Sequence, residues 1–98
     1  MDMREIIAKG TAAQTNEYVF EKEDIPATVV VDGTLGATET IAVNLVGIDG
    51  TSVTPATDAL GSTVLLSLTN ANLAISAPVR LQFVKGVTAA AVGVFVER

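Results

Sequence analysis

Residues 79–83 read Val-Arg-Leu-Gln-Phe, with an apolar side chain at every second position. In an extended strand successive side chains point to opposite faces, so the three apolar residues share one face and Arg80 and Gln82 share the other. The same period of two recurs in residues 25–31, 41–45, 63–69 and 92–96, and a shorter run at 73–75 fits a further strand. A helical period of 3.6 residues fits none of these segments. The pattern therefore predicts a series of β-strands, with mostly β-branched residues at the inner positions.

Turn residues fall between these segments. Asp32-Gly33-Thr34 follows one strand, and Asp49-Gly50-Thr51 lies in the middle of a hairpin signal, where Asp and Gly supply the positive φ angles of a tight turn. Asn70-Ala71-Asn72, Ala77-Pro78 and Lys85-Gly86 mark three more breaks. Short connections without helices indicate antiparallel neighbours, because parallel pairs need long crossovers. The sequence therefore predicts an all-β fold, an antiparallel β-sandwich or jelly roll of about seven strands.

The N-terminal segment does not follow the alternation. Within residues 4–9 only Ile6 and Ile7 are large apolar residues, and residues 10–16 are small and polar. We expect residues 1–16 to form an extended N-terminal arm that becomes ordered on a partner or pairs with another chain, and residues 17–98 to form the β-sandwich domain. The alternative is a floppy terminus without a role.

Composition excludes several classes of function. The 98 residues suffice for one domain, and the chain contains neither Cys nor His. This removes disulfides, the usual zinc ligands, the thiolate nucleophile and the histidine base, so we expect no catalysis and no cofactor or metal. The N-terminus does not read as a secretory signal, and no apolar run approaches the roughly 20 residues of a membrane helix, so we expect a soluble protein without a membrane partner.

Charge is unevenly distributed. The net charge of −5 opposes binding to the phosphates of nucleic acid, so we expect no nucleic-acid partner. Residues 1–24 hold six of the eleven acids and three of the six bases, and no basic residue lies between Glu23 and Val79. The outer faces of the later strands must then be Thr, Ser, Asn and Ala, whereas free surfaces normally intersperse both charges. Part of this surface is therefore predicted to be covered by a neighbour.

Few residues suggest chemistry. The two Asp-Gly-Thr triplets lack the spacing of a calcium loop, so we interpret each Asp as a turn residue that accepts local backbone N–H bonds. The serines have no companion base, and a pair of catalytic carboxylates drawn from Glu39, Asp49 and Asp58 would lack the aromatic cleft usual for a glycosidase. The acidic cluster of Glu21, Glu23 and Asp24 is interpreted as solvated charge before the first confident strand, with pairing to a basic partner as the alternative.

Several runs together carry a resemblance to a known group of proteins. They are Asp-Ile-Pro-Ala-Thr-Val at residues 24–29, Gly-Ala-Thr-Glu-Thr-Ile-Ala-Val at 36–43, Asp-Gly-Thr at 49–51, Leu-Thr-Asn at 68–70 and Gly-Val-Phe-Val at 93–96. In texture and order of turns, residues 24–96 resemble the small β-sandwich virion proteins of tailed bacteriophages. Those most alike in style are capsid decoration (cement) proteins, which bind the outside of the icosahedral head.

The resemblance implies a function, a partner and a location. It implies a homo-oligomer, with a trimer favoured, that is made in the host cytoplasm, binds the major capsid protein on the capsid exterior of the virion and stabilises its contacts. As partner-binding residues we expect those of the arm and of the first aromatic pair: Arg4, Ile6, Ile7, Tyr18 and Phe20. The alternative is a tail-associated or secreted β-sandwich module that binds a host glycan or surface protein.

Overall fold

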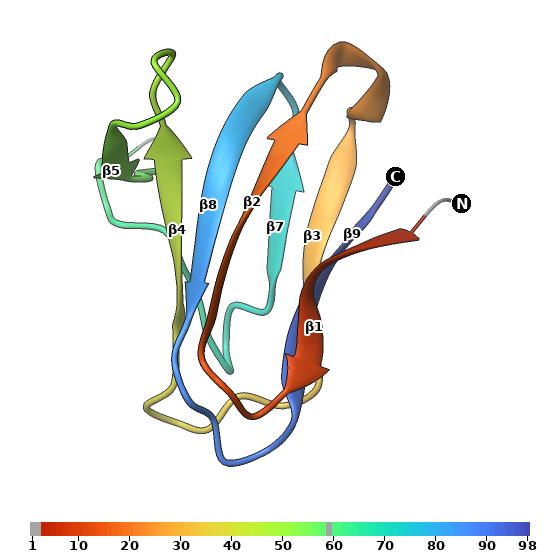
Figure 1. Ribbon diagram of the computed structural model, residues 1–98, viewed down its shortest axis with the longest axis vertical. Coiled ribbons are helices and arrows are strands. Elements are labelled where there is room, and N and C mark those ends of the chain that lie inside the picture. The colour runs from red at the N-terminus through yellow and green to blue at the C-terminus, as the bar shows by residue number, and fades with distance from the viewer. Residues whose placement is uncertain (1–2, 59) are drawn as a thin grey trace.

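The computed structural model describes residues 3–58 and 60–98 (Figure 1). Over these residues the chain forms nine strands and one short 3-10 helix, Lys22–Asp24. The strands are β1 (Met3–Gly10), β2 (Gln14–Phe20), β3 (Ala27–Asp32), β4 (Ile41–Val46), β5 (Val53–Pro55), β6 (Leu65–Leu66), β7 (Asn72–Ile75), β8 (Val79–Lys85) and β9 (Val92–Glu97). The predicted all-β fold is confirmed, with nine strands rather than about seven.

The strands form two antiparallel sheets packed face to face. One has the order β1-β9-β3-β7, and the other has the order β2-β8-β4-β5, with β6 also paired to β4. Apart from the β4, β5 and β6 segment, each strand is followed by a strand of the opposite sheet. With β6 left aside, eight strands wind through two four-stranded sheets in the manner of a jelly roll.

The core lies between the sheets and is aliphatic except for two phenylalanines. On β3 the side chains of Ala27, Val29 and Val31 are buried, and on β9 those of Val92, Val94 and Val96, so the alternation read from the sequence is correct on both strands. Phe20 and Phe83 are the largest fully buried side chains. The alternation of buried and outward residues follows from the pleat, because only every second residue of a strand faces the opposite sheet.

The predicted arm is a strand of the sandwich. Residues 1 and 2 lie outside the described residues, but β1 pairs with β9 from Met3↔Glu97 to Gly10↔Val92, and β2 begins already at Gln14. Ile6 and Ile7 are both buried in the core. The division into an arm of residues 1–16 and a domain of residues 17–98 is therefore wrong, because burying two isoleucines stabilises this segment on the sheet.

A β-bulge explains why the alternation failed to predict β1. Glu5 pairs with Phe95 and Ile7 with Val94, so Ile6 is an extra residue and both isoleucines turn inward. The bulged strand runs very close to Gly93, where a Cβ would lie 2.7 Å from the Ile7 carbonyl oxygen and 2.8 Å from the Lys9 nitrogen. Only glycine permits this approach of the two backbones.

Three loops close the end of the sandwich at the bottom of Figure 1. Leu35, from the loop between β3 and β4, is buried there. The buried Lys85 donates from Nζ to the Ala12 carbonyl at 2.6 Å, and the Thr88 N–H donates to the Thr11 carbonyl at 3.0 Å. Glu39 accepts the N–H groups of Gly36 at 2.7 Å and Ala89 at 2.9 Å, so the loops are cross-linked by hydrogen bonds.

Candidate interaction surface

The outer face of the β2-β8-β4-β5 sheet is the surface that bears on the prediction of a covered face. Leu81 and Phe83 are buried, so Arg80, Gln82 and Val84, which alternate with them along β8, point outward. The residues paired with these three on β2 and β4 point to the same side of the sheet. The outward residues, here called the neutral face, are Thr15, Glu17, Val19, Ala42, Asn44, Val46, Val53, Pro55, Leu65, Arg80, Gln82 and Val84.

The neutral face carries only two charged residues, and these form an ion pair. Arg80 donates to Glu17 Oε1 from Nη2 at 2.6 Å and from Nε at 2.9 Å. Beside this pair the Asn44 amide donates to Gln82 Oε1 at 3.1 Å. The remaining positions are aliphatic or hydroxyl side chains, and Val19 and Val53 are 49% and 41% exposed. The face therefore combines a neutral net charge with apolar side chains that remain in contact with water.

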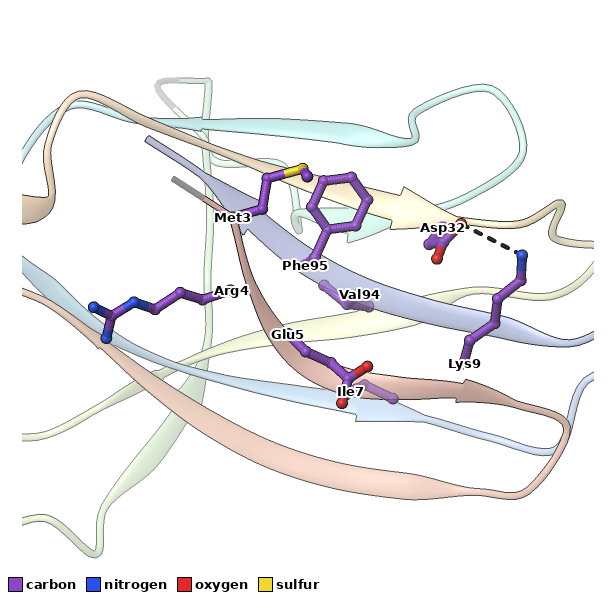
Figure 2. Close-up of a pocket in the computed structure, with 8 residues that line it drawn as sticks. All are labelled: Met3, Arg4, Glu5, Ile7, Lys9, Asp32, Val94 and Phe95. Atoms are coloured by element: carbon purple, nitrogen blue, oxygen red, sulfur yellow. Dashed lines mark ion pairs between the residues drawn. The ribbon is translucent and has the colours of Figure 1, made fainter. Parts of the chain in front are cut away.

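The outer face of the other sheet is more charged. Between β1, β9 and β3 it holds a shallow depression of about 360 Å³, here called the β1–β9 depression (Figure 2). Figure 2 shows Met3 beside the Phe95 ring, and an ion pair joins Lys9 Nζ to Asp32 Oδ1 at 3.5 Å. Ile7 and Val94 also border the depression, but their side chains are almost fully buried and face the core, so Met3 and Phe95 contribute the apolar side chains of its lining.

The structure separates the five predicted partner-binding residues. Ile6, Ile7 and Phe20 are at most 3% exposed, so the prediction that they contact a partner is wrong, since they are part of the core. Tyr18 is half-buried, and its ring centroid lies 4.7 Å from that of Phe20 at an interplanar angle of 54°. Arg4 is exposed and lines the β1–β9 depression. Only Arg4 therefore keeps a fully exposed position for a contact with a partner.

The Asp49 triplet forms the predicted turn. Asp49 Oδ1 accepts the N–H groups of Thr51 at 3.0 Å and Ser52 at 2.9 Å, and Oδ2 accepts the Ser52 hydroxyl at 2.7 Å. These bonds, the Ser52 backbone bond first, hold the pKa of Asp49 well below its usual range. Gly50 supplies the positive φ, 77°. The first triplet differs, because Asp32 ends β3 and its carboxylate pairs with Lys9.

Three other acidic residues, Asp24, Glu39 and Asp58, stabilise local structure. Asp24 accepts the Glu21 N–H at 2.9 Å, and this bond caps the start of the short 3-10 helix; the Asp24 carboxylate also pairs with Arg98. Asp58 accepts the N–H groups of Leu60 at 2.9 Å and Ser62 at 3.0 Å in a second tight turn. Hydrogen bonds from the Gly36 N–H, then the Ala89 N–H, lower the pKa of Glu39.

Within residues 3–58 and 60–98, no three acidic side chains come together in a group that could hold a metal ion. No helix in that part of the chain is long and apolar enough to cross a membrane.

Sequence reasoning missed the aliphatic side chains at the tips of the turns. Ile48, in the turn between β4 and β5, is fully exposed, and Leu60, in the turn held by Asp58, is 92% exposed. An available signal was the position of each residue in a turn, with a Gly next to it and an Asp within two residues, where the side chain has no sheet to pack against.

No protein-family model matches the chain, and no curated protein and no solved structure is significantly similar to it. The surfaces described above are therefore what supports a function for this chain.

Proposed function

We propose that this chain is a decoration protein of a tailed-phage head, which binds the outer surface of the capsid and stabilises contacts between major capsid proteins. The observation that carries the proposal is the neutral face, with one internal ion pair among its twelve outward residues. A protein of net charge −5 that leaves a whole sheet face without net charge has a surface suited to contact another protein.

The geometry of the face suits binding in many copies. Four strands spaced by about 4.8 Å give a face roughly 20 Å wide, so each copy offers a contact smaller than a typical stable interface. Such a contact is sufficient on a capsid when one particle offers many equivalent sites and several are engaged together. The jelly roll supplies a rigid support, because every strand of the face is hydrogen-bonded to a neighbour.

A module that binds a host glycan or surface protein is less well supported. Sugar recognition commonly uses an exposed Trp or Tyr ring, and the chain has no Trp and a single Tyr, Tyr18, which packs against Phe20.

Binding to purified heads of the phage that encodes the chain tests the proposal. Wild-type protein should sediment with heads that lack it and reach a fixed copy number per head. Ala42→Lys adds a charge to the middle of the neutral face and should lower the occupancy. The matched control is Thr28→Lys, which adds the same charge at a half-buried outward position of the opposite sheet and should leave occupancy unchanged.

The two possible failures are distinguishable. Absence of wild-type protein from the heads would overturn the capsid role itself. Equal occupancy by wild type and Ala42→Lys, with both variants folded by circular dichroism, would overturn the assignment of the neutral face.

A further inference from the structure

β7 forms an open edge of the four-stranded sheet. It is the last strand in the order β1-β9-β3-β7, so it pairs with β3 on one side only. The Val31 N–H donates to the Ala71 carbonyl at 2.9 Å, and in an antiparallel ladder every second pair of residues is bonded in this way. The pairs that include Asn72 and Ala74 lie between the bonded pairs, so the N–H and C=O groups of these two residues point away from β3.

The outward backbone groups of β7 have no partner in the described part of the chain. Over residues 3–58 and 60–98, no hydrogen bond joins the N–H and C=O groups of Asn72 and Ala74 to another residue. Both side chains are exposed, so solvent reaches the edge. Open N–H and C=O groups at every second residue are the groups that an extended polypeptide pairs with when it adds a strand to a sheet.

The other three edges of the sandwich are protected against such pairing. β1 carries the bulge at Ile6 and three charged residues. On β2 the Asn16 side chain accepts the Glu17 N–H at 3.0 Å, and β5 has only three residues and ends in Pro55. β7 has no charged residue, no proline and no bulge. Since proteins commonly protect sheet edges by these means, the edge of β7 is the one suited to receive a strand.

The side chains of β7 indicate the chemistry of the added strand. Residues bonded to Asn72 and Ala74 would place their side chains on the outer face, and the residue between them would lie opposite the half-buried Leu73. This favours a segment in which polar and aliphatic residues alternate. An acidic segment is disfavoured, because the chain has a net charge of −5 and no basic residue lies between Glu23 and Val79.

A flexible segment fits this edge better than a second folded copy of the chain. Four residues at about 3.3 Å each give a strand only about 13 Å long. Two rigid sandwiches joined along so short an edge would bury far less than the roughly 800 Å² per partner of a stable interface. A flexible segment can also follow the surface beyond the edge, which adds contact area.

We propose that β7 accepts an extended, neutral or basic segment of another protein as a fifth strand of its sheet. The added strand bonds to the backbone of Asn72 and Ala74 and covers Leu73. The proposal does not depend on the capsid role or on the neutral face, because β7 belongs to the opposite sheet.

Selection from a library of random linear heptapeptides tests the proposal. Wild-type protein should enrich neutral or basic peptides in which polar and aliphatic residues alternate. Ala74→Pro removes an open N–H without breaking a bond to β3, so it should weaken binding of a selected peptide about tenfold or more. Met3→Pro is the matched control, because it places the same ring at the first residue of β1, on the other edge of the same sheet, and binding should be unchanged.

Methylation of the peptide backbone distinguishes strand pairing from other modes of binding. An extended peptide directs every second N–H to one edge, so methyl groups on the nitrogens that face β7 should abolish binding, and methyl groups on the nitrogens between them should be tolerated. Circular dichroism checks the folding of Ala74→Pro, and Asn72→Pro blocks the same edge at the first residue of β7. Three outcomes would overturn the proposal: no enriched peptide, equal binding by wild type and both β7 variants, and equal binding of the two methylated peptides.

Discussion

Replacing Gly93 by Ala tests the close approach of β1 to β9. The added Cβ would lie 2.7 Å from the Ile7 oxygen, 2.8 Å from the Lys9 nitrogen and 2.9 Å from the Lys9 Cα, all backbone atoms that cannot rotate away. Overpacking a tight site costs about 1–3 kcal/mol. Releasing β1 instead would expose Ile6 and Ile7, whose burial together contributes about 3–6 kcal/mol. We therefore expect Gly93→Ala to lower the free energy of unfolding by about 3 kcal/mol, at the upper end of the overpacking range.

Urea and thermal unfolding measure this effect. For a domain of about 100 residues, 1 kcal/mol corresponds to about 4–8 °C, so the expected fall in Tm is about 12–24 °C. Gly10→Ala is the control on β1, the strand that packs against Gly93, because a Cβ at Gly10 meets no heavy atom within 4 Å and stability should change by less than about 0.5 kcal/mol. Equal stability of Gly93→Ala and Gly10→Ala would refute the described packing of β1 on β9.

Two further predictions concern the loop end of the sandwich. Leu35→Ala should destabilise the protein by about 2–5 kcal/mol in urea unfolding, because Leu35 is 2% exposed, whereas Leu68→Ala at a 50% exposed position should cost far less; similar losses would contradict the burial of Leu35. The pKa of Glu39 is lowered from 4.5, so its carboxylate contributes stability that is present above pH 4.5 and is lost as the pH falls through the lowered pKa. Unfolding followed from pH 6 down to about pH 2 should therefore depend less on pH in Glu39→Gln, and parallel profiles of the two proteins would exclude this role for Glu39.

The fold was predictable wherever a strand alternates without interruption. β3, β4, β8 and β9 begin and end within two residues of the segments recognised by their period of two. β1 was not predictable in this way, because the bulge at Ile6 places two consecutive residues on the inner face. The expected strand at residues 63–69 is reduced to Leu65–Leu66, since Thr63 bridges to Thr57 and Ser67 forms a turn with Asn70.

The candidate surface was predictable only in outline. The absence of bases between Glu23 and Val79 indicated low charge on β4 and β5, but the neutral face also includes β2 and β8, whose Glu17 and Arg80 neutralise each other. The contact residues were not predictable in the same way. Ile6, Ile7 and Phe20 were expected at a partner interface because the pairing of β1 with β9 and of β2 with β8 joins distant segments, which local sequence does not reveal. Lys85 was assigned to a turn, yet it ends β8 with its ammonium group buried against the Ala12 carbonyl.

The position of β9 determines when this protein can fold during synthesis. β9 is the last of the nine described strands in chain order, yet it lies between β1 and β3 in the sheet order. Until its final residues emerge, β1 has no partner in its sheet and one side of β3 is unpaired, so cotranslational folding cannot complete this sheet. β1 therefore stays without a partner strand while about 80 further residues are synthesised, and strand pairings between residues so far apart in the sequence form slowly. A nascent chain stalled before Val92 would therefore present two open strand edges to chaperones and to other nascent chains.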